Sequence, residues 1–154
     1  MKALLLFAIT LHAATAIVES RGEARIQVPN HREVLLMDFR TASIEAWKVK
    51  KATLALHVKE GSQPKTILLS TIPSRWTEED PSPAAKGLFQ QSKRFPTKEM
   101  GEGWIGVEVA PEFVEAMAAG KSYGLAVEQE GFKLHGRGPA YFSFQFLVEG
   151  EPRP

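Results

Sequence analysis

Three glycine-containing patterns between residues 101 and 124 consist of residue types that could do chemistry. Gly101, Gly103 and Gly106 spell the G-x-G-x-x-G of a dinucleotide-binding loop. The run Gly120-Lys121-Ser122 resembles the end of a phosphate-binding loop, and with Gly124 it also spells the G-x-S-x-G of a hydrolase nucleophile elbow. Each pattern can work only where a strand leads through a tight turn into a helix, so the surrounding elements decide its meaning.

The predicted elements give none of the three patterns that context. The first glycines precede a strand, WIGVEV at 104–109, and the second group follows a short helix predicted from Pro111 to Ala119. A phosphate loop would also need glycine where this chain has Glu115. We therefore expect Gly101 and Gly103 to form a turn and Gly120 to cap the helix. The protein is predicted not to be an enzyme.

The remaining inventory of metal-binding and catalytic side chains is small. The sequence has no cysteine, and His31, His57 and His135 lack the H-x-H and H-E-x-x-H spacings of zinc sites. The adjacent acids Glu78, Glu79 and Asp80 could supply calcium ligands, but such runs in proline-rich segments usually face solvent. The sequence therefore predicts no metal or other cofactor. It permits a structural calcium ion, but no motif indicates one.

Alternation of apolar and polar residues predicts a protein built of strands. In AYFSFQFLVE at 140–149, Phe144, Phe146 and Val148 share one face, and EVLLMDF at 33–39 is apolar on both faces, which is typical of a central strand. A charge at Asp38 in that run predicts a partner such as an arginine or a backbone N–H. About eight strands are expected, at 24–28, 33–39, 51–59, 65–72, 104–109, 123–128, 132–135 and 140–149. The fold class is all-β, an antiparallel β-sandwich or jelly roll with one short helix.

The N-terminus has the features of a secretory signal peptide. Lys2 is followed by a short apolar run and by the A-x-A site Ala14-Thr15-Ala16. We expect a signal peptide at 1–16 and a single domain at 17–154, secreted or periplasmic and without a membrane span. The near-neutral net charge gives no reason to expect nucleic acid as a partner. The segment 77–102 is predicted to be a long loop of unassigned role.

The order of several short motifs resembles the DNRLRE-type domain grouped with carbohydrate-binding module family 96. The resembling segments are EVLLMDF, VKKATLALHV, RWTEED, GWIGVEVAPEFVEAMAAGKSYGLAVE and RGPAYFSFQFLVE, which together cover nearly all of residues 17–154. Two parts of the family pattern are absent: Pro81-Ser82-Pro83 stands where a tryptophan and an Asn-Pro pair are expected, and the Ser-Arg-Glu before the last strand is missing. The resemblance implies a jelly-roll module that binds polysaccharide, in some members an acidic one such as alginate.

Two functions are consistent with this reading. The first is a secreted, non-catalytic module that binds polysaccharide, with acidic polymers favoured. Its candidate residues would stack on sugar rings or pair with uronate carboxylates, and they are Trp76, Trp104, Tyr141, Lys51, Lys59, Lys133 and Arg137. The alternative is a structural or protein-interaction sandwich at the cell surface, with an extracellular protein as partner and no sugar site.

Overall fold

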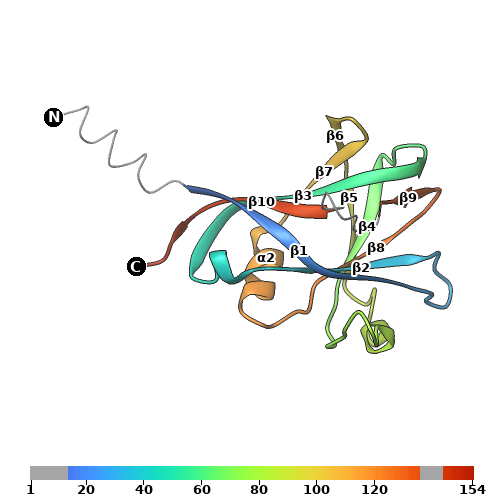
Figure 1. Ribbon diagram of the computed structural model, residues 1–154, viewed down its shortest axis with the longest axis horizontal. Coiled ribbons are helices and arrows are strands. Elements are labelled where there is room, and N and C mark those ends of the chain that lie inside the picture. The colour runs from blue at the N-terminus through green and yellow to red at the C-terminus, as the bar shows by residue number, and fades with distance from the viewer. Residues whose placement is uncertain (1–13, 136–143) are drawn as a thin grey trace.

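The structure is a computed structural model that describes residues 14–135 and 144–154 (Figure 1). Antiparallel strands dominate it. Its one α-helix within the described residues, α2, spans Pro111–Ala118, and two 3-10 turns, η1 and η2, span Ala42–Ile44 and Ser82–Ala85. The strands are β1 (Ala14–Ile26), β2 (Val34–Phe39), β3 (Trp47–Gly61), β4 (Thr66–Thr71), β5 (Ser92–Pro96), β6 (Lys98–Gly101), β7 (Trp104–Val109), β8 (Leu125–Glu128), β9 (Phe132–Leu134) and β10 (Phe144–Pro152).

The strands form two sheets with jelly-roll connectivity. Sheet A has the order β1-β10-β3-β7-β6, and sheet B has the order β1-β2-β8-β4-β5. Strand β1 belongs to both, because residues 14–19 pair with β10 and residues 20–26 pair with β2, with a register shift between Ser20 and Gly22. The chain passes repeatedly from one sheet to the other, which is the jelly-roll arrangement that the sequence pattern predicts.

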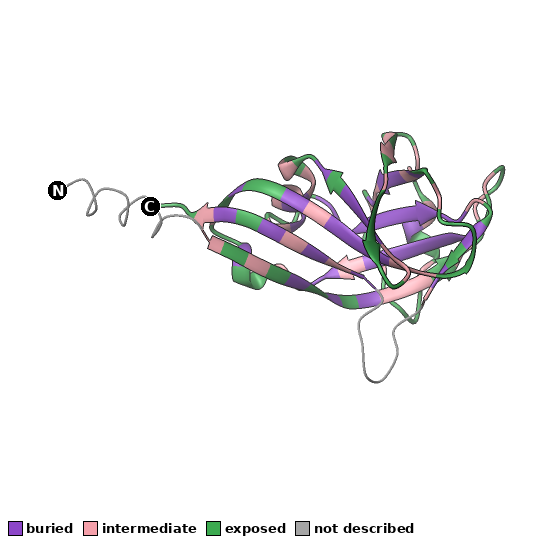
Figure 2. Ribbon diagram, turned by 90° about the horizontal axis from the view of Figure 1, so that it is seen from above, coloured by how far each residue is buried: buried purple, intermediate pink, exposed green. Residues whose placement is uncertain are grey.

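The main core lies between the two sheets. The inward positions of β10 and β3 alternate with outward ones, so that Figure 2 shows buried and less buried bands along the strands. Phe39 packs against the rings of Phe144 and Phe146, with centroid distances of 5.3 and 4.7 Å. From α2 the core receives Val114 and Met117, while Phe113 is half-buried beside it. This packing of inner faces confirms the predicted sandwich.

Sheet B is apolar on its outer face as well, and a second small core covers that face. Val34, Leu36 and Ala126 point away from the main core. They pack against Ile72, Ala84 and Leu88. These three residues belong to residues 72–91, here called the cover segment. The double-sided burial of β2 follows directly from its unbroken apolar run.

Several boundaries differ from those predicted. The expected loop at 77–102 contains η2, β5 and β6, whose short, mostly exposed strands carry little hydrophobic periodicity. Strand β1 begins at Ala14, before the predicted start at 24, so the expected signal-peptide cleavage site lies inside a strand. No helix in residues 14–135 and 144–154 is long and apolar enough to cross a membrane.

The glycines of the three patterns lie where the strand context predicts. Gly101 and Gly103 have positive φ in the β6–β7 turn, and Gly106 lies inside β7. Gly120 follows α2 with φ of 73°, and its N–H donates to the Met117 carbonyl at 3.1 Å. Ser122 lies between α2 and β8. The predicted turn and helix cap are therefore confirmed.

Candidate binding groove on sheet A

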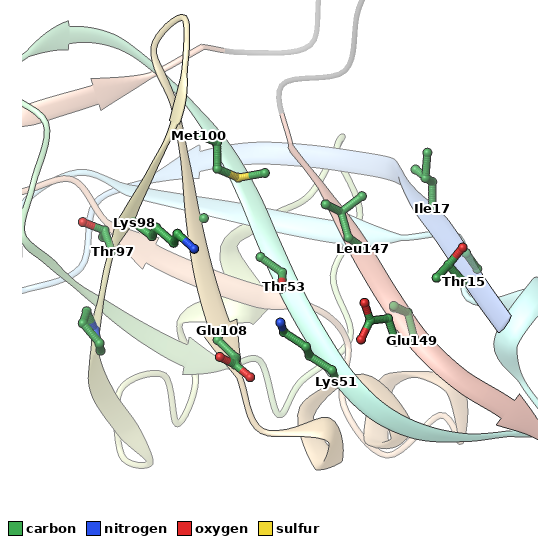
Figure 3. A pocket seen from close by; sticks show the side chains of 14 residues that line it. Thr15, Ile17, Lys51, Thr53, Thr97, Lys98, Met100, Glu108, Leu147 and Glu149 are labelled. Carbon is green, nitrogen blue, oxygen red and sulfur yellow. The ribbon is translucent and has the colours of Figure 1, made fainter. Parts of the chain in front are cut away.

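The described structure has a groove of about 920 Å³ on the outer face of sheet A. Neighbouring strands contribute to it in register: Ile17 pairs with Leu147, Leu147 with Thr53, and Thr53 with Glu108. Figure 3 shows these side chains projecting from the same side of the sheet. The lining is Thr15, Ala16, Ile17, Lys51, Thr53, Pro96, Thr97, Lys98, Met100, Gly106, Glu108, Leu147, Val148 and Glu149.

Small residues on the two middle strands make this face concave. Ala55 of β3 pairs with Gly106 of β7, so that neither strand carries a large side chain there. Met100 of β6 leans over the glycine, since a Cβ built at Gly106 would lie 2.8 Å from the Met100 sulfur. Ile17 and Leu147 border the opposite side, and Ile17 and Met100 are 59% and 46% exposed. Small residues therefore line the floor of the groove, and aliphatic side chains line its borders.

The charges around the groove are balanced. Lys51 and Lys98 contribute two positive charges, and Glu108 and Glu149 contribute two negative charges. Lys51 lies directly opposite Glu149 in the pairing of β3 with β10. Opposite charges at such positions lie about 5 Å apart at Cβ and partly neutralise each other. Lys51 thus lines the groove, with the Glu149 carboxylate on the neighbouring strand.

An aromatic column lies on the same sheet at the far end of β3. The Trp104 ring stacks on His57 at a centroid distance of 4.7 Å, and His57 stacks on His135 at 4.3 Å. Burial lowers the pKa of His135 below its ordinary value of 6.5, and the positive charges of His57 and Lys59 lower it further. Trp104 is half-buried. One of its ring faces is occupied by the histidine, and it is two residues from Gly106 of the groove.

The other candidate residues are not gathered at the groove. Lys59 and Lys133 are exposed beyond the aromatic column, on β3 and β9. Trp76 lies in the cover segment, where its Nε1–H donates to the Tyr123 carbonyl at 2.7 Å and its ring packs against the second core. Tyr141 and Arg137 lie outside the described residues. The structure therefore places Lys51 and Trp104 on one sheet face but not together, because Trp104 pairs with His57, six residues along β3 from Lys51.

Sequence reasoning missed the aliphatic lining of the groove. The available signal was an apolar residue at an outward position of an alternating strand, as at Leu147 between the inward Phe146 and Val148. Ile17 was assigned to the expected start of the mature chain and not to a strand. Met100 fell in the predicted loop.

The acids considered for calcium binding do not form a cluster. Glu78 accepts a hydrogen bond from the backbone N–H of Glu23 at 3.2 Å, and Asp80 accepts one from the Ser82 hydroxyl at 3.1 Å. Within the part of the chain that the structure describes, no group of three or more histidine or carboxylate side chains is arranged to hold a metal ion.

A separate polar network ties the far end of sheet B together. Burial raises the pKa of Glu128, but the hydrogen bonds that it accepts from the Arg32 N–H and from His31, together with the charge of His31, outweigh burial and lower the pKa below 4.5. The distances from Glu128 to the Arg32 nitrogen and to His31 Nδ1 are 2.7 and 3.3 Å. The His31 ring also stacks on Phe89 of the cover segment at 4.4 Å. This network links the cover segment to β8.

Comparison with known proteins adds no family to this description. No family model and no curated protein matches the chain. The geometry of the groove and the motif resemblance therefore remain the grounds for assigning a function.

Proposed function

We propose that this protein is a secreted, non-catalytic binding module that holds a polysaccharide chain in the groove of sheet A. The observation that carries the proposal is an open, concave sheet face, about 920 Å³ in volume, with Trp104 two residues along β7 from Gly106 of its lining. A sugar chain can lie along such a face and stack on an aromatic ring at one end. The motif resemblance to the DNRLRE-type domain supports the same class of ligand, and the signal-peptide pattern supports export. Cleavage after Ala16 would remove Thr15 and Ala16 from one end of the groove and leave Ile17 and the other lining residues in the mature chain.

The lining of the groove bears on which polysaccharide would bind. Because two lysines and two glutamates balance there, apolar contact and stacking account for more of the expected affinity than charge does. A neutral polymer fits this balance at least as well as the acidic polymer implied by the resemblance. Affinity gel electrophoresis with a neutral β-glucan and with alginate tests both.

The Thr53→Phe variant tests the location of the site. Thr53 is half-buried in the floor of the groove, so a phenyl ring there fills the groove while keeping a side chain that suits a strand. We expect that the polysaccharide no longer retards this variant in the gel. Its urea denaturation midpoint should equal that of the parent protein. The matched control is Lys93→Ala, an exposed change on β5 of sheet B, which should bind normally. Normal binding by Thr53→Phe would place the site elsewhere.

The alternative function, a protein-interaction module, has its own supporting observation. Ile17 and Met100 are the large hydrophobic side chains that stand exposed among the described residues, and both border the groove. Exposed aliphatic side chains on a concave face are typical of surfaces that contact proteins. If the purified protein is retarded by no polysaccharide, while Thr53→Phe abolishes binding to an extracellular protein partner, this second function replaces the first.

A further inference from the structure

A second, smaller pocket of about 300 Å³ lies where the end of β2, the turn after α2 and the start of the cover segment meet. It shares no lining residue with the groove of sheet A. Phe39 and Met117 supply apolar lining, and charged and hydroxyl side chains contribute the polar part. Ligand pockets combine an apolar lining with a few fixed polar groups, and this volume suits a ligand of about one ring.

The pocket carries a net positive charge. Arg21 donates from Nε and Nη2 to the two carboxylate oxygens of Asp38, at 2.9 and 3.3 Å. The Asp38 carboxylate also accepts the Phe39 N–H at 2.9 Å, so its charge is satisfied by these partners. Arg75 lies with its guanidinium 5.6 Å from the centre of the Tyr123 ring and forms no ion pair with any described residue. Its charge therefore remains available to a ligand.

Aromatic side chains lie beside this charge. Tyr123 lines the pocket, and the Arg75 guanidinium lies over its ring. The nearby Trp76 is held in place by its own hydrogen bond to the Tyr123 carbonyl, which gives the pocket a fixed aromatic wall.

We propose that this pocket binds the carboxylate of a small organic acid of about one ring in size. The Arg75 guanidinium pairs with the carboxylate, and the ring of the acid lies against Trp76. Arginine suits this task because its planar donors match the two oxygens of a carboxylate. The site goes beyond the proposed function, because it is independent of the groove.

The test is a titration with sodium glucuronate at constant ionic strength, with glucose as the uncharged comparison. The reporter is the Trp76 indole N–H signal in a proton–nitrogen NMR spectrum, assigned by its loss in Trp76→Phe. We expect a saturable shift with glucuronate and none with glucose. A titration with a uronic acid trimer then tests whether the pocket also accepts the carboxylate at the end of a sugar chain. Binding of the free acid or of the trimer supports the site.

One variant and two controls complete the experiment. Arg75→Gln should weaken glucuronate binding about tenfold or more, as expected for losing a charged hydrogen-bonding partner. Lys133→Gln controls for net charge, and Thr53→Phe should leave the titration unchanged, which separates this site from the groove. Equal binding of glucose, or unchanged binding by Arg75→Gln, would overturn the proposal.

Discussion

Two carboxylates illustrate how single residues are accommodated in this fold. Asp38 places a charge in the apolar strand β2, and its oxygens accept hydrogen bonds from Arg21 and from the Phe39 N–H, as the sequence predicted for an acid in such a run. Glu115 of α2 accepts hydrogen bonds from the buried Val49 N–H at 3.3 Å and from Arg153 at 2.9 Å. It therefore connects the helix to β3.

The Glu115→Ala variant should lower the free energy of unfolding by about 1 kcal/mol, since it leaves the Val49 N–H without this acceptor. The control is Glu112→Ala on the same helix, where the side chain is exposed in the first turn and a loss of only about 0.3 kcal/mol is expected. Urea denaturation measures both. Equal losses in the two variants would mean that the bond to β3 contributes nothing.

The Lys51→Ala/Lys59→Ala double variant tests the acidic-polysaccharide version of the function. If an acidic chain binds along β3, the double variant should bind it more weakly, and salt should weaken binding by the parent because screening acts over about 8 Å at 0.15 M. Stability should change by less than about 0.5 kcal/mol, because both lysines are exposed. Binding that responds neither to salt nor to these substitutions would point to a neutral chain held by the aliphatic lining.

At the scale of the elements, the cover segment makes the two sheets different. It lies over the apolar outer face of sheet B, where Leu88 and Ala84 pack with Val34 and Leu36. Strand β6 acts differently on sheet A, since it extends the sheet edge and places Met100 beside the groove. The segment between β4 and β7 thus covers the outer face of sheet B and shapes the groove of sheet A.

The Leu88→Ala variant should lower the free energy of unfolding by about 2 kcal/mol, the low end for a large-to-small change in a core, because the second core is small. Lys86→Ala, exposed on the same segment, serves as the control and should have almost no effect. Polysaccharide binding should be unchanged in both variants, because the groove lies on the other sheet. A loss of binding in Leu88→Ala without unfolding would show that the cover segment supports the groove.

At the scale of the whole molecule, strand β1 holds the sandwich together along one edge. Its first half pairs with β10 of sheet A and its second half with β2 of sheet B, so the two sheets are continuous through one chain segment. Two titratable groups among the described residues have shifted pKa values, and they lie on either side of the β8–β9 hairpin. His135 follows β9 and stacks on His57 of β3, and Glu128 ends β8 and lies in the network that links β8 to the cover segment.

Folding stability should fall in two steps as the pH is lowered. The pKa of His135 is depressed in the folded protein, so the unfolded chain binds its proton more readily and stability declines as pH falls through 6.5. The pKa of Glu128 is also depressed, so the stability it contributes above 4.5 is lost at lower pH. His135→Gln should flatten the first step and Glu128→Gln the second, as measured by urea denaturation across pH 7.5 to 3.5. A first step that persists in His135→Gln would assign it to another group.

The sequence by itself determined the fold class, the inward face of most strands, the short helix and the role of the glycines. These features depend on local backbone geometry and on the alternation of apolar and polar residues. Both are local properties of the sequence and do not depend on where a strand lies in the fold. It also determined that Asp38 needed a partner, since a buried charge is costly in any fold.

Only the tertiary structure decided where a ligand could bind. Alternation shows that Leu147 and Thr53 point outward, but it cannot show that they become neighbours across β10 and β3, with Ile17 and Met100 bordering the same hollow. Trp76 and Trp104 look alike in the sequence, yet one packs into the second core and the other lies on β7, two residues from Gly106 of the groove. Whether an outward side chain is covered depends on segments distant in the chain, and their packing is not encoded in the local pattern of residues.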